Sequence, residues 1–185
     1  LILLESLLEK MSGPFGLFKG ASKNDIKTGN EISKFTYEIP SPPKPHSFFP
    51  SVYATITPNH GVSFVKAISK QISTSGAGLE LKADFNTYTE KLKKTYGNPV
   101  VVDNFMDGGI YDQYTDWMDS INYKERAYFA SWDVEDGLSL PNELKTIFLG
   151  VSVEDSFTGY IFIEYYFNNN DDAEAEISAL EDDAL

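Results

Sequence analysis

Five aspartates lie close together in the sequence near the middle of the chain. Their type and spacing come nearest to those of a catalytic or metal-binding site. The segment 103–119, DNFMDGGIYDQYTDWMD, holds Asp103, Asp107, Asp112, Asp116 and Asp119. Clustered carboxylates bind Ca²⁺ or serve as general acid and base. The spacing lacks the D-x-D-x-D-G pattern and the closing glutamate of a calcium loop. We therefore interpret these aspartates as solvated side chains of a loop and a helix, and keep an enzyme that uses them as the alternative.

The two histidines and the absent cysteines narrow the chemistry further. His46 lies in a proline-rich run and His60 in a predicted turn, and neither stands in a recognisable serine–acid arrangement. A zinc site needs three or four nitrogen, sulfur or oxygen ligands, and two histidines that lie far from the acid clusters do not favour one. The sequence therefore predicts no catalytic residue, no metal and no cofactor. The absence of cysteine is compatible with the reducing cytoplasm, where we expect the protein to be.

The charge balance restricts the partners. The formal net charge is −13, residues 171–185 hold seven acids and no base, and Arg126 is the one arginine. Nucleic-acid surfaces need clustered Lys and Arg, so no nucleic-acid partner is expected. The acidic surface favours either solubility alone or a protein partner with a basic patch. The apolar run 1–11 is too short to span a bilayer, so no membrane partner is expected either.

Hydrophobic periodicity predicts an α+β protein with an antiparallel sheet of six or seven strands and helices mainly on one face. The helical signals lie at 1–11 and 84–96. Strand signals lie at 33–39, in a hairpin at 51–72, and at about 125–133, 145–153 and 159–168. We divide the chain into an N-terminal helix and linker (1–14), two α+β halves (15–73 and 79–168) and a disordered acidic tail (169–185). The halves show the same order of elements, which indicates two tandem modules or, alternatively, a single domain.

Two short motifs carry a family resemblance. The first motif is FGLFKGASKNDI (15–26), in which Ser22 and Asp25 form a capping-box-like helix start. The second motif is YGNP (96–99). They resemble the helix start and helix end of the modules in the β-lactamase inhibitor protein and the outer-membrane assembly lipoprotein. Ala21 departs from the usual methionine, and the family's cysteines are absent. The resemblance implies helices on an antiparallel sheet whose open face binds another protein, and it implies no particular site residue.

Aromatic residues on the late strands form the candidate site. In YIFIEYYF (160–167) one face carries Ile161, Ile163, Tyr165 and Phe167, which we expect in the core. The opposite face carries Glu164 among aromatic rings. If each strand keeps its aliphatic side inward, one aromatic sheet surface results, with the candidate partner-binding residues Tyr53, Tyr128, Trp132, Phe148, Tyr160, Phe162 and Tyr166.

The alternative is that a helix of the same chain, 1–11 or 84–96, covers this face. A covered Glu164 would then need Arg126 or a lysine as its partner. Because Tyr and Trp bury large areas at interfaces, we expect a non-catalytic protein-binding domain of the inhibitor or immunity type. The alternatives are the aspartate-based enzyme and a structural or assembly subunit that docks through residues 1–11.

Overall fold

The computed structural model describes residues 4–5 and 12–183, and the strands within them form a nine-stranded antiparallel sheet. The strand order is β1-β2-β3-β4-β9-β8-β7-β6, and the short β5 pairs with β9. The predicted α+β class is confirmed, with more strands than the six or seven expected. The strands are β1 (Glu31–Ser33), β2 (Thr36–Glu38), β3 (Ser51–Thr57), β4 (Gly61–Ile68), β5 (Ile72–Ser73), β6 (Val100–Phe105), β7 (Arg126–Asp133), β8 (Leu144–Asp155) and β9 (Thr158–Phe167).

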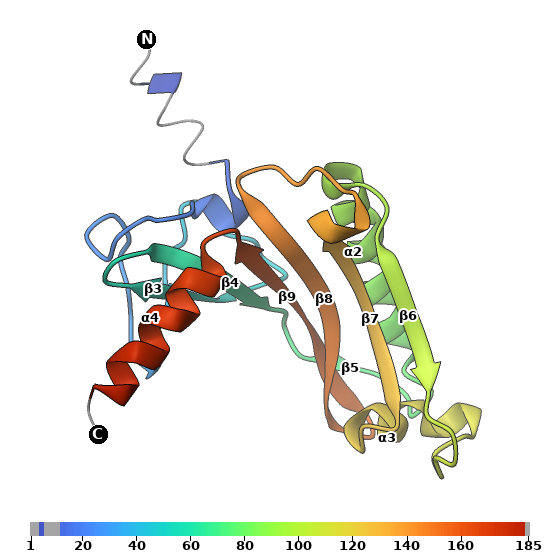
Figure 1. Cartoon of the computed structure of the whole chain (residues 1–185). Helices are drawn as coiled ribbons and strands as arrows, with labels where there is room; N and C mark the ends of the chain where they lie inside the picture. The colour runs from blue at the N-terminus through green and yellow to red at the C-terminus, as the bar shows by residue number, and fades with distance from the viewer. Residues whose placement is uncertain (1–3, 6–11, 184–185) are drawn as a thin grey trace. The chain divides into compact units, whose positions relative to one another are not determined.

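The helical elements stand before, between and after these strands (Figure 1). They are η1 (Pro14–Gly16), α2 (Leu79–Tyr96), η2 (Tyr114–Asp116), α3 (Trp117–Asn122), η3 (Val134–Asp136) and α4 (Asn170–Asp182). None of the helices in the described part of the chain is long and apolar enough to cross a membrane.

The chain divides into two compact units, each assembled from separate segments. Unit 1 holds the residues up to Ala67, Leu140–Thr146 and the residues from Glu164 onward. Unit 2 holds Ile68–Ser139 and Ile147–Ile163. The units differ from the predicted halves 15–73 and 79–168, because β8 and β9 contribute residues to both units.

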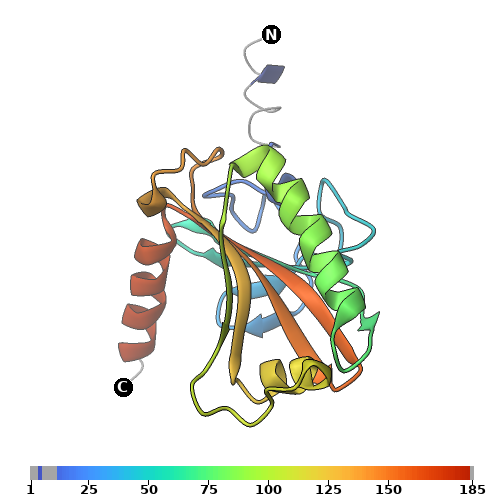
Figure 2. The ribbon, with the colours of Figure 1, turned by 90° about the vertical axis from the view of Figure 1, so that its right-hand side faces the viewer.

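In unit 2, α2 packs one apolar stripe against one face of the strands (Figures 1 and 2). Leu81, Phe85 and Tyr88 recur at helical spacing and are 0%, 1% and 8% exposed. Lys93 and Lys94 stand in the last turn, where the helix dipole favours cations. The helix predicted at 84–96 is present and begins earlier, at Leu79.

In unit 1, the predicted hairpin forms as β3 and β4, and the proline-rich loop 40–50 contains no strand beyond a single bridge between His46 and Phe49. Other local predictions were wrong. Phe35 has a φ of 60°, so 33–39 turns between β1 and β2 instead of forming one strand. The Asp25 carboxylate accepts hydrogen bonds from the backbone N–H and the hydroxyl of Ser22, both at 2.8 Å, but the two residues close a turn and not a helix. The helix predicted at 1–11 lies, apart from Leu4 and Glu5, outside the described residues.

The acidic end forms α4 instead of the disordered tail that was predicted. The buried Asn169 donates its side-chain amide to the carbonyls of His60 and Val62, at 3.0 and 3.1 Å. The carboxylate of Glu176, 6% exposed, accepts a 3.0 Å hydrogen bond from the backbone N–H of Asn59 and lies 2.7 Å from Nδ1 of His60. These polar contacts hold the helix to the β3–β4 turn. Of the apolar side chains of α4, Ala173 is 0% exposed, whereas Leu180 stays 41% exposed.

Candidate functional site

Three phenylalanines from adjacent strands of unit 2 form a stacked row. Phe129 of β7 lies 4.9 Å from Phe148 of β8, ring centre to ring centre, at an interplanar angle of 30°. Phe148 lies 6.0 Å from Phe162 of β9 at 27°. Val102 of β6 is the register partner of Phe129, so it stands on the same face at the end of the row. We call Phe129, Phe148 and Phe162 the aromatic row; all three side chains are half-buried.

Gly150 of β8 leaves the space that the rings of Phe148 and Phe162 occupy. A Cβ built on Gly150 would lie 2.6 Å from Cζ of Phe162 and 2.9 Å from Cε1 of Phe148. Real Cβ atoms essentially never approach so closely, so any larger residue must push the two rings aside. The stacked position of the two rings over β8 therefore depends on glycine at this site.

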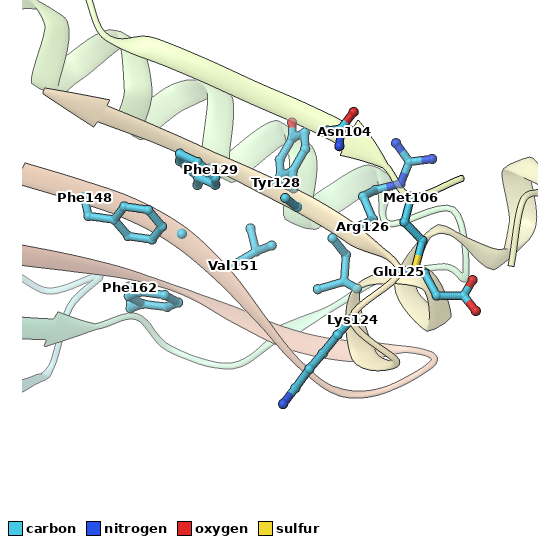
Figure 3. A pocket seen from close by; sticks show the side chains of 13 residues that line it. Asn104, Met106, Lys124, Glu125, Arg126, Tyr128, Phe129, Phe148, Val151 and Phe162 are labelled. Atoms are coloured by element: carbon cyan, nitrogen blue, oxygen red, sulfur yellow. The ribbon is translucent and has the colours of Figure 1, made fainter. Parts of the chain in front are cut away.

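The aromatic row forms part of the wall of an open pocket with a cavity volume of about 390 Å³. Figure 3 shows the three rings in succession on neighbouring strands and Lys124, Glu125 and Arg126 toward the other end of the pocket. All lining residues belong to unit 2. The lining is mainly apolar, with a few charged groups at one end, which is the composition of a binding pocket.

The charged end of the pocket is fixed by hydrogen bonds. Oε2 of Glu125 accepts from the backbone N–H groups of Ile110 and Tyr111, at 2.9 Å each. Arg126 pairs with Asp103 and donates from Nε to Oγ of Ser120 at 3.2 Å. Glu125 and Arg126 are thus both engaged in hydrogen bonds within unit 2, which fix the shape of this end of the pocket.

Two predicted site residues lie on the opposite face of β7, and their assignment to the aromatic surface was wrong. Tyr128 packs against Phe85 of α2 at 4.6 Å and against Trp117 of α3 at 5.0 Å, ring centre to ring centre. Trp132 is 0% exposed, and its indole N–H donates to the carbonyl of Gly97 at 2.8 Å. These rings belong to the core beneath α2.

The remaining predicted residues fall into two groups. Phe148 and Phe162 are brought together in the aromatic row, and Tyr160 is half-buried two positions before Phe162 on β9. Tyr53 and Tyr166 belong to unit 1 and are also half-buried. Tyr53 lines a small cavity of about 150 Å³ between β3 and the flanking prolines.

In unit 1, Glu164 is paired with a basic side chain, as we expected of a covered carboxylate. The partner is Lys66 and not Arg126. Nζ of Lys66 lies 2.9 Å from the Glu164 carboxylate, whose side chain is 18% exposed. Tyr166 donates its hydroxyl to the same carboxylate at 2.7 Å, and its ring lies 4.9 Å from Phe64. Burial and this bond to Glu164 raise the pKa of Tyr166 well above its usual range. Its hydroxyl is therefore neutral and committed to an internal bond.

The aspartates of 103–119 do not converge. Asp103 pairs with Arg126, Asp119 accepts from the Ser156 hydroxyl at 2.8 Å, and Asp107 and Asp112 are exposed. In the described part of the chain, no three histidine, aspartate or glutamate side chains gather closely enough to hold a metal. The geometry of these residues thus offers no support for the enzyme hypothesis.

Phe129 is the site residue that sequence reasoning missed. The alternation of a strand places residues 127, 129 and 131 on one face and residues 126, 128 and 130 on the other. The prediction placed Tyr128 and Trp132 on the outward face, and this choice put Phe129 on the inward face. A comparison of this chain with protein-family models, curated proteins and solved structures finds no match. The resemblance to the β-lactamase inhibitor protein therefore stays a prediction.

Proposed function

We propose that this chain is a non-catalytic protein-binding domain that contacts its partner through the aromatic row and the adjoining pocket of unit 2. The observation that carries the proposal is the stacking of Phe129, Phe148 and Phe162 on the face of unit 2 that α2 does not cover. Rigid aromatic rings bury a large area on association and lose little side-chain entropy. A pocket beside them gives a partner's side chain a place to anchor.

The charge of the chain indicates what kind of partner fits. Unit 2 carries 14 acidic and seven basic side chains, a net charge of −7 that contributes to the −13 of the whole chain. A charge of this size attracts a protein with a basic patch and increases the rate of encounter. An acidic domain with a preformed aromatic surface suits an inhibitor or an immunity-type protein, which acts by covering a site on its target.

The proposal is tested by affinity purification of tagged variants from the native cell. Wild type and Phe148→Ser are compared with Phe157→Ser, which removes a ring that is 63% exposed in the β8–β9 turn and lies outside the aromatic row. We expect a partner that wild type and Phe157→Ser retain and Phe148→Ser loses, with all three proteins folded by circular dichroism. A partner that wild type and both variants retain equally would contradict the proposal.

A further inference from the structure

The outer edge of β6 is a second surface of unit 2 that has the properties of a binding site. β6 is the last strand of the sheet order, and Figure 2 looks onto its side of unit 2. Edge strands are commonly protected by shortness, by proline or charged side chains, or by a bulge, and Asp103 is the one such group in β6. β6 has the sequence VVVDNF and pairs with β7 in unbroken register over all six residues. Val100 and Val101 are 47% and 55% exposed.

The register fixes which backbone groups point outward from β6. The backbone N–H of Met106 donates to the carbonyl of Glu125 at 2.8 Å, so this pair is a hydrogen-bonded pair of the antiparallel ladder. Hydrogen-bonded and non-hydrogen-bonded pairs alternate along such a ladder. Val100, Val102 and Asn104 therefore bond to β7, and the N–H and C=O groups of Val101, Asp103 and Phe105 point to the free edge. These outward groups make no backbone hydrogen bond within the described residues.

The side chains on either side of this edge indicate what an added strand would carry. On the pocket face, Val100 and Val102 lie at the end of the aromatic row, so the adjacent side chains of an added strand would be apolar. On the α2 face the exposed charge is Asp103, whose side chain is 49% exposed against 20% for its partner Arg126. Lys82, in the first turns of α2, is turned over the Trp117 ring at 4.3 Å. The carboxylate is therefore the charge that a neighbouring strand would meet.

We propose that β6 binds an extended segment of a partner protein as an additional strand, and that alternate side chains of this segment are apolar and basic. Main-chain hydrogen bonds to Val101, Asp103 and Phe105 give such a complex its affinity, and the two rows of side chains give it specificity. A second copy of this chain fits the edge less well, because each copy carries a net charge of −13. This inference concerns a different surface and does not depend on the aromatic row binding a partner.

A capped synthetic peptide of about eight residues that alternates valine and lysine tests the proposal, with a matched peptide of alternating valine and glutamate as control. Binding is followed by amide NMR and hydrogen exchange on the intact protein. We expect the lysine peptide to bind at least about tenfold more tightly than the glutamate peptide. The amides of Val101, Asp103 and Phe105 exchange freely without the peptide and become protected with it. The amides of Val102 and Asn104, which already bond to β7, change little.

Three variants separate the edge from other sites. Val101→Pro removes an outward N–H without breaking a bond to β7, and should weaken binding about tenfold, whereas Val101→Thr keeps the N–H and should bind as wild type does. Phe148→Ser should leave peptide binding unchanged, so failure of the aromatic row and failure of the edge are distinguishable. The proposal is overturned if neither peptide binds, if the peptide shifts the aromatic row without protecting the three amides, or if these amides are protected by self-association alone.

Discussion

The two faces of β7 carry aromatic residues of the same kind in opposite situations. Tyr128 and Trp132 face α2 and pack against Phe85, Trp117 and the Gly97 carbonyl. Phe129, between them in sequence, faces the other way and stacks on Phe148. One face is closed by a helix of the same unit, and the other carries a pocket. Aromatic content alone therefore does not identify a binding surface. A face with aromatic rings is available for binding only if no other part of the unit covers the rings.

The difference has an energetic consequence. A ring beneath α2 has already gained its burial free energy on folding, and its removal must create a cavity. A ring in the aromatic row has gained only part of that free energy, and the remainder is available when another surface covers it. Mutations on the two faces should therefore have different effects. Removing a ring beneath α2 should reduce stability, and removing a ring of the aromatic row should reduce binding.

The largest effect is expected for Trp132→Ala. The side chain is 0% exposed and its indole N–H is bonded to Gly97, so we expect a loss of about 3–5 kcal/mol in the free energy of unfolding. Phe148→Ala, on the open face, should cost about 1 kcal/mol or less. Urea denaturation followed by circular dichroism measures both values. Equal losses would show that the two faces do not differ as their burial indicates.

The sequence predicted the elements of unit 2 better than their orientation. The helix at 84–96 and the late strands follow from apolar periodicity, which is a local property. The orientation of β7 does not, because both of its alternating sets contain aromatic rings and alternation alone cannot tell which set α2 covers. The core set of β9 was assigned correctly: Ile161 and Phe167 are 0% exposed, and Ile163 and Tyr165 are 3% and 4% exposed.

The acidic helix α4 shows a second limit of sequence reasoning. Ile177 and Leu180 offer little apolar surface, which favoured disorder. The helix is held instead by polar partners far away in the chain, including His60 for Glu176. Burial raises the pKa of Glu176, but hydrogen bonds from Thr57, His60 and the backbone of Asn59 lower it by more. The pKa of Glu176 is therefore below its usual value. No local pattern encodes such a long-range set of hydrogen bonds.

An intermediate effect is expected for Gly150→Ala. The new Cβ would displace the ends of the Phe148 and Phe162 rings, and these half-buried rings can move, so we expect a loss of about 1 kcal/mol in stability. The stacking of the aromatic row should nevertheless be lost, which ring-current shifts of the Phe protons in NMR would show. Gly137→Ala is the control, since its φ of +84° strains the backbone and no atom lies within 4 Å of its Cβ, so this variant destabilises the fold without touching the rings. A stack that survives Gly150→Ala, or breaks in both variants, would contradict the role assigned to Gly150.

The smallest effect is expected in the titration of Tyr128. Burial beneath α2, and then the charge of Asp103, raise the pKa of its hydroxyl above the usual value of about 10. A hydroxyl whose pKa is higher in the folded state than in the unfolded state makes its full contribution to stability below about pH 10. This contribution is lost as the pH rises through the pKa of the folded state. The free energy of unfolding of wild type should therefore fall more steeply above pH 10 than that of Tyr128→Phe.

The neighbouring position on the other face supplies the control for this titration. A tyrosine introduced by Phe129→Tyr would have its hydroxyl next to water and should ionise near pH 10. The Cζ resonances of ¹³C-labelled tyrosine in NMR would report both ionisations in the folded protein. If the two hydroxyls, one residue apart on β7, ionise at the same pH, then α2 does not exclude water from its face, and the contrast between a closed and an open aromatic face does not hold.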